Sequence, residues 1–147
     1  MTWLDGQMEN FKNRTRRDLD IKANAPALFK AVWDEIFAIV QEASGKGFDL
    51  KPNGNSERRS LEYIGGPTYS PTGMRPEIIT ISLSQNRHAL EVSGLKDGPL
   101  AFQIEPCADN IVCLHFRGEQ KTPGEVAHIV MGCFLFGTVN RPVTLQP

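Results

Sequence analysis

The spacing of apolar residues changes once along this chain, close to Gly45 and Gly47, from a helical period to alternation. Before that point apolar residues recur every three or four positions, which is typical of helices with one buried side. After it, in IITISLS and the segments that follow, apolar and polar residues alternate, as they do in strands that bury one face of a sheet. The sequence therefore predicts an α+β protein whose first helices precede an antiparallel sheet.

Two N-terminal helices are expected before the change of period. The second begins at Asn24, a good capping residue, and accepts Pro26 in its first turn, where a missing N–H costs little. It runs to about Ser44, and its apolar stripe is wide enough to require two packing neighbours. Whether the first helix packs on its own domain or on a neighbouring molecule is left open. Its apolar side is formed by Leu4, Met8, Phe11, Thr15 and Leu19.

An antiparallel meander of four to six strands is expected after the helices. Two short strands lie around Leu50 and Leu61, and four longer ones follow the Gly- and Pro-rich segment GGPTYSPTGMRP, which is predicted to be a loop. A two-residue turn at positions 86 and 87 would place Leu83 opposite Leu90. The apolar positions of the four longer strands are Ile79, Ile81 and Leu83; Leu90 and Val92; Leu100, Phe102 and Ile104; and Val112, Leu114 and Phe116.

A C-terminal helix is expected to begin at the segment TPGE. Thr122 and Glu125 have the spacing of a capping box, and Pro123 suits the first helical position. The apolar residues that follow are predicted to pack on the apolar face of the sheet. The tail from about residue 138 is predicted to be irregular, and residues 1–147 to form a single domain.

The charge balance gives no support for nucleic-acid or membrane partners. With 16 basic and 17 acidic residues, the molecule has no overall field that attracts phosphate backbones or anionic lipid. The basic stretch KNRTRR is followed by Asp18 and Asp20 and has no aromatic platform, so we expect a solvated helix face there. The longest apolar run, residues 129–139, is too short to span a membrane.

The cysteines and the first residues predict a cytoplasmic protein. Cys107, Cys113 and Cys133 are odd in number and include no C-x-x-C pair, so neither a disulfide framework nor a zinc site is expected, and the thiols are predicted to be reduced. The first residues carry acidic side chains and no apolar core, unlike a secretory signal.

The polar face of the meander holds the best candidates for chemistry. Alternation places Glu91, Glu105, His115 and Arg117 on this face, where a carboxylate beside the imidazole would suit acid/base work. Any solvent-facing sheet shows the same pattern, so these four residues stay weak candidates and no catalytic residue is assigned. Cys113 and His115 share the face but lack further ligands at a recognisable spacing, so no metal and no cofactor is expected.

The sequence supports two functional hypotheses and assigns no family. The first is a non-catalytic binding or adaptor domain that acts through protein contacts, as a homodimer or with another protein, because the helices carry surplus apolar surface. The alternative is a small-molecule-binding protein or a small acid/base enzyme that uses the polar sheet face. The substrate or partner cannot be identified from the residues alone.

Overall fold

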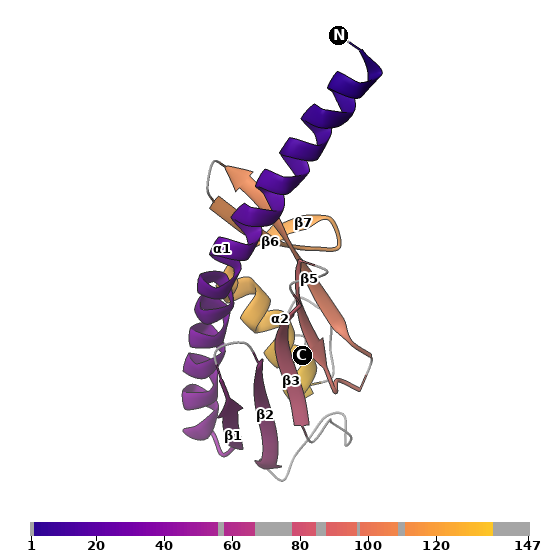
Figure 1. Ribbon diagram of the computed structural model, residues 1–147. Coiled ribbons are helices and arrows are strands. Elements are labelled where there is room, and N and C mark those ends of the chain that lie inside the picture. Colours follow the sequence, from indigo (N-terminus) through magenta and orange to yellow (C-terminus); the bar gives the residue numbers. More distant parts are fainter. Residues whose placement is uncertain are drawn as a thin grey trace.

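The computed structural model describes residues 2–55, 58–66, 78–84, 88–96, 98–108 and 111–136. A long helix, α1 (Trp3–Ser44), precedes a seven-stranded antiparallel sheet along the chain, and a shorter helix, α2 (Pro123–Phe136), follows it (Figure 1). The predicted α+β class is therefore confirmed. The strands are β1 (Asp49–Gly54), β2 (Arg58–Gly65), β3 (Ile78–Ser84), β4 (Ala89–Ser93), β5 (Leu100–Ala108), β6 (Ile111–Phe116) and β7 (Glu119–Lys121).

The sheet is a meander in which every strand pairs with the next strand along the chain. The register predicted for β3 and β4 is confirmed, because Leu83 lies opposite Leu90. The turn expected at positions 86 and 87, most of the segment GGPTYSPTGMRP and the tail from residue 138 lie outside the described residues.

The expected number of strands, four to six, is wrong because β7 was missed. Arg117 and Gly118 both have positive φ, 53° and 83°, and join Phe116 to its pairing partner Glu119. Positive φ at both central residues is the mark of the two-residue turn that suits a right-handed hairpin. Arg-Gly is a weaker signal for this turn than Asn-Gly, and the three residues of β7 show no apolar alternation.

The two N-terminal helices that were expected are one continuous helix, α1. Asn24 does not cap a second helix: its side-chain amide donates to the carbonyl of Asp20 within the same helix, at 2.7 Å. Ile21, Ala25 and Phe29 are all buried on one side, so packing holds the chain helical through Pro26 and offsets the missing hydrogen bond. Figure 1 shows a helix that is not straight, as an internal proline would cause.

The predicted C-terminal helix is confirmed as α2, and its cap is the expected box. Thr122 N–H donates to the Glu125 carboxylate at 2.9 Å, and Glu125 N–H donates to Thr122 Oγ1 at 3.1 Å. The buried residues of α1, α2 and the sheet form one hydrophobic core. Within the described ranges, no helix is both long and apolar enough to cross a membrane.

Cys107 and Cys113 form a disulfide, which corrects the expectation of reduced thiols. Their Cα atoms are 5.9 Å apart, within the usual range for this bond. Spacing rules missed the pair because the antiparallel pairing of β5 and β6 brings the two residues together. The cytoplasmic location rested partly on reduced thiols, so it loses that support and stays a prediction.

Candidate protein-binding surface on the projecting helix

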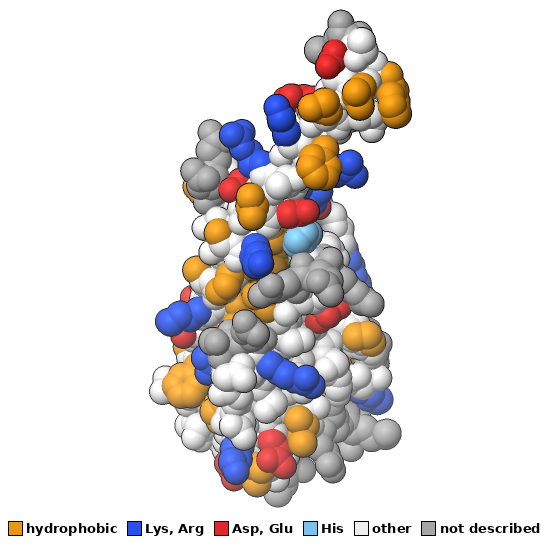
Figure 2. Space-filling view, viewed as in Figure 1, with side chains coloured by type: hydrophobic (Ala, Val, Ile, Leu, Met, Phe, Trp, Pro, Cys, Tyr) orange, Lys and Arg blue, Asp and Glu red, His pale blue; other side chains and the backbone are white. Residues whose placement is uncertain are grey.

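The first part of α1 extends beyond the sheet, and none of its residues is buried before Ile21 (Figure 1). We call residues 3–19 of α1 the free segment. At 1.5 Å per residue, it is about 25 Å long. Large apolar side chains lie on it: Trp3 is 78% exposed, Phe11 65% and Leu19 61%. Figure 2 shows hydrophobic side chains gathered on the projecting part of the molecule.

The start of the free segment is fixed by a capping box of its own. Thr2 N–H donates to the Asp5 carboxylate at 3.0 Å, and Asp5 N–H donates to Thr2 Oγ1 at 3.2 Å. The hydrogen bond from the Thr2 backbone lowers the pKa of Asp5 below its usual value. Thr and Asp three residues apart are typical of a helix start, and this signal was missed in the prediction of the first helix.

The apolar side of the free segment continues the side of α1 that packs on the sheet. Leu4, Met8, Phe11 and Thr15 recur at steps of four, three and four, so they form one row on this side. Further along α1 the same side is buried at Phe29, Trp33 and Val40, whereas before Ile21 it is exposed. We call its exposed part the apolar row, which consists of Leu4, Met8, Phe11 and Thr15.

A second row, which is charged, lies one position later at each step and therefore about 100° further round the helix than the apolar row. This charged row consists of Asp5, Glu9, Lys12 and Arg16, all exposed. Its first half is acidic and its second half is basic. A shallow groove of about 430 Å³ is lined by residues of both rows, including Phe11, Lys12 and Arg16. Such a groove is where a second helix can seat its own side chains.

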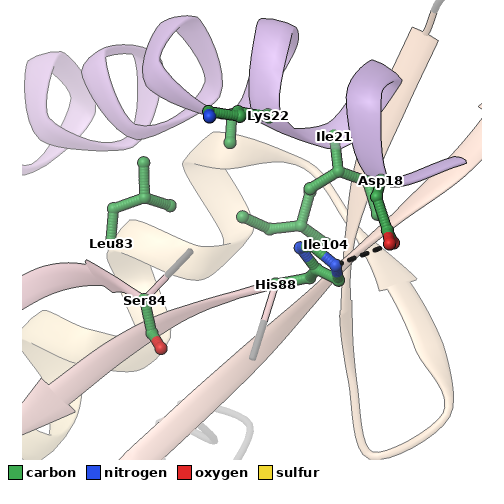
Figure 3. A pocket seen from close by; sticks show the side chains of 8 residues that line it. Asp18, Ile21, Lys22, Leu83, Ser84, His88 and Ile104 are labelled. Atoms are coloured by element: carbon green, nitrogen blue, oxygen red, sulfur yellow. Dashed lines mark hydrogen bonds and ion pairs between the residues drawn. The ribbon is translucent and has the colours of Figure 1, made fainter. Parts of the chain in front are cut away.

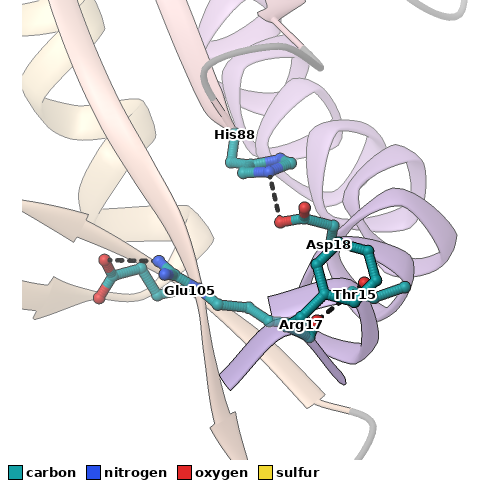
Figure 4. Close-up of polar contacts among 6 residues, drawn as sticks. Thr15, Arg17, Asp18, His88 and Glu105 are labelled. Atoms are coloured by element: carbon teal, nitrogen blue, oxygen red, sulfur yellow. Dashed lines mark hydrogen bonds and ion pairs between the residues drawn. The ribbon is translucent and has the colours of Figure 1, made fainter. Parts of the chain in front are cut away.

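Two ion pairs connect α1 to the sheet at the end of the free segment (Figure 4). The guanidinium of Arg17 lies 3.2 Å from the carboxylate of Glu105 in β5. The carboxylate of Asp18 lies 3.0 Å from Nε2 of His88, just before β4. Consecutive helix residues therefore contact two different parts of the sheet and set the direction in which the free segment leaves it.

A pocket of about 190 Å³ opens beside these ion pairs, between α1, the end of β3, His88 just before β4, and the middle of β5 (Figure 3). Half of its lining residues are apolar and half are polar or charged, whereas most ligand pockets are lined predominantly by apolar side chains. It is smaller than most ligand sites. Its lining residues are Asp18, Ile21, Lys22, Ala25, Leu83, Ser84, His88 and Ile104.

The four candidate residues of the polar sheet face lie in different environments. Glu91 faces Ser82 and Ala101 on the neighbouring strands. His115 faces Gln103 and Gln120, in another cross-strand row and two strands away from Glu91. The strand pairing therefore separates this carboxylate from the imidazole.

The other two candidates serve structural contacts. Glu105 is the partner of Arg17 on α1. Arg117 lies in the turn between β6 and β7, with its guanidinium carbon 4.9 Å from the ring centre of Phe116. Cys113, which the sequence placed beside His115, is in the disulfide and offers no thiol.

The residues of the free segment were visible in the sequence as a helical face, but not as an exposed surface. The period of Leu4, Met8 and Phe11 is the same as that of the buried residues further along α1. Only the extent of the sheet shows which part of the face is covered. No family model, curated protein or solved structure matches this chain, so the surface is interpreted from its own chemistry.

Proposed function

We propose that this protein is a non-catalytic binding domain that acts through protein contacts, as a homodimer or with another protein, and that the free segment is its binding surface. One observation carries the proposal. The apolar face of α1 extends past the sheet and stays exposed from Trp3 to Leu19. Contiguous apolar surface of this kind is typical of protein interfaces. An amphipathic helix that places apolar side chains every three or four positions is a common recognition element.

The stability of the free segment supports the same proposal. Isolated helices of this length are marginally stable in water, and Gly6, Asn10 and Asn13 have low helix propensity. No residue of the segment is buried, and Arg17 and Asp18 contact the sheet at its end. A partner that covers the apolar row would supply the missing stabilisation, because each large apolar side chain that becomes fully buried contributes roughly 1.5–3 kcal/mol.

The proposal is tested by capture of partners from a cell extract that also contains an untagged copy of the chain. We expect the wild type to retain at least one protein, either the untagged copy or another protein. That protein should bind the Phe11→Glu variant at least about tenfold more weakly than it binds the wild type. Ile64→Glu is the matched control, because Ile64 is equally apolar and 53% exposed but lies on β2. If Phe11→Glu retained every bound protein as well as the wild type does, the free segment would not be the binding surface.

A second candidate function is ligand binding at the polar sheet face. It is favoured by one buried ring nitrogen. Nδ1 of His115 is shielded from solvent and has no hydrogen-bond partner among the described residues. Buried polar atoms of this kind are uncommon, and a bound group can satisfy them. In this alternative, binding of a small molecule would shift the ring resonances of His115 in NMR spectra and His115→Ala would abolish the binding. Unchanged binding by His115→Ala would exclude it.

A further inference from the structure

We propose that the partner of the free segment is a second copy of the chain, whose free segment packs against the first in the antiparallel direction. The inference rests on the proposed function, since it names the partner of the same surface. It follows from the order of charges in the charged row, from the length of the free segment, and from the position of the pocket.

The charged row is complementary to itself when it is reversed. Read forward it is acid, acid, base, base, and read backward it is base, base, acid, acid. Two antiparallel helices related by a two-fold axis bring the same flank of each helix face to face. Glu9 then meets Lys12 of the second copy, and Asp5 meets Arg16. The two-fold axis repeats each of these ion pairs.

Within a single helix the charged row contains one attractive neighbouring pair, Glu9 with Lys12, and two repulsive ones. Asp5 and Glu9 are four positions apart with like charge, and so are Lys12 and Arg16. Like charges at this spacing destabilise a helix, by a few tenths of a kcal/mol per pair. A second copy in the antiparallel direction compensates every one of these charges. A parallel pair would instead bring the charged row against the opposite flank, which carries Arg14 and no acidic residue.

The length of the free segment allows this pairing without collision of the two bodies. When Glu9 faces Lys12 of the second copy, residue 4 of one helix lies level with residue 17 of the other. Arg17 and Asp18 are the residues at which α1 meets the sheet. Each helix therefore overlaps the other along the exposed stretch and ends where the body of the other copy begins. Met8 and Phe11 lie at the centre of the pair, where apolar contact is best shielded.

The same alignment gives a role to Trp3 and to the pocket beside the ion pairs. Trp3 of one copy falls level with Asp18 of the other, and Asp18 lines the pocket. Trp3 and Ile21 also lie on the same flank of α1, so these flanks face each other across the pair. An indole ring with its apolar body and one N–H donor suits a small pocket with mixed apolar and polar lining.

The test uses two double variants of the full chain, studied by size exclusion with light scattering. Asp5→Lys/Glu9→Lys makes the charged row wholly basic, and Lys12→Glu/Arg16→Glu makes it wholly acidic. We expect the wild type to be a dimer and each variant alone to associate at least about tenfold more weakly. Mixing the two variants restores a dimer that contains one copy of each. This recovery also shows that both variants still form the helix.

Matched controls make the same changes of charge on the part of α1 that lies on the sheet. Asp34→Lys/Glu42→Lys alters exposed residues there, and Lys30→Glu/Lys46→Glu alters one exposed residue there and one just after α1 ends; both should leave the dimer intact. The antiparallel pairing would be wrong if both double variants of the charged row formed dimers as stable as that of the wild type. It would also be wrong if mixing the two variants did not restore a dimer. A wild type that is monomeric at all concentrations would exclude a second copy as the partner of the free segment. Binding of the free segment to vesicles of anionic lipid would not change that conclusion. The capture experiment decides the proposed function separately, because it scores other proteins as well.

Discussion

The carboxylate of Asp18 lies 3.0 Å from Nε2 of His88, and the preceding residue, Arg17, is paired with Glu105. These two contacts mark the place where α1 stops packing on the sheet and becomes the free segment. His88 adopts a left-handed backbone, with φ 48°, and its carbonyl accepts a hydrogen bond from Ile104 N–H at 2.8 Å. The imidazole is thus held by the sheet in position to meet the helix.

Loss of both contacts should weaken association more than folding. Arg17→Ala/Asp18→Ala removes both ion pairs, and exposed pairs contribute about 0–1 kcal/mol each, so the free energy of unfolding should fall by less than about 2 kcal/mol. The free segment loses its fixed direction, so we expect a weaker dimer and faster amide exchange around residues 17–25. The control Lys30→Ala/Asp34→Ala removes an exposed pair within α1. Equal weakening by the control would show that the two contacts have no special role.

Acid should weaken the capping box at the start of α2. The hydrogen bond from Thr122 N–H lowers the pKa of Glu125 below its ordinary value of 4.5. A lowered pKa in the folded state means that the stabilisation is complete above the ordinary pKa and is lost as pH falls through the folded value. Glu125→Gln should therefore lower the free energy of unfolding at about pH 6 and have little effect at about pH 3.

Asp5→Asn is the matched comparison for that prediction. Asp5 caps the free segment, which is outside the core, whereas Glu125 caps α2, which is inside it. Asp5→Asn should reduce helical content at the start of α1 without a change in the urea midpoint of global unfolding, provided that the protein is kept dilute and monomeric. Equal effects of Asp5→Asn and Glu125→Gln on that midpoint would mean that the free segment unfolds together with the core.

The turn between β6 and β7 should tolerate Asn but not a β-branched residue at position 117. Arg117 has φ 53° and is followed by Gly118. Asn adopts this conformation readily, so Arg117→Asn should stay within about 1 kcal/mol of the wild type. Arg117→Val should lose about 1–2 kcal/mol, because a branched side chain is strained there. Urea unfolding measures both, and a Val variant as stable as the Asn variant would contradict the turn.

The disulfide between Cys107 and Cys113 should stabilise the β5–β6 hairpin. The two residues are six apart in sequence, and closing a loop of that size in the unfolded chain corresponds to roughly 2 kcal/mol. Cys107→Ser/Cys113→Ser should lower the free energy of unfolding by about that amount. Addition of a reducing agent to the wild type should have the same effect and should leave the double variant unchanged. A reducing agent that also destabilises the double variant would point to another target.

The features that the sequence predicted are those with local signals. The change of period near Gly45, the register of β3 and β4 and the box at Thr122 each depend on residues close together in the chain. The features that it missed depend on distant parts. Continuity of α1 through Pro26 requires the sheet that buries Ala25, and the disulfide requires the pairing of β5 with β6.

The candidate surface shows the same limit. Leu4, Met8 and Phe11 were predicted as one side of a helix, and the structure keeps them on one side. What covers that side could not be predicted, because identical spacing is found in the buried half of α1. The polar sheet residues were placed on one face by alternation, but their cross-strand neighbours depend on the bulge and turn positions of β5 to β7.

The distance between identical spin labels in the dimer reports directly whether the two free segments pair in the antiparallel direction. Labels on cysteines introduced at Asn13 and at Ala23, both exposed on α1, avoid Cys133, which is buried. Antiparallel pairing separates the two labels along the helix axis by about 8 Å at position 13 and about 38 Å at position 23. We expect pulsed EPR to find a distance at position 23 that is longer than the distance at position 13 by more than about 20 Å. Equal distances at both positions, as in a parallel pair, would contradict it.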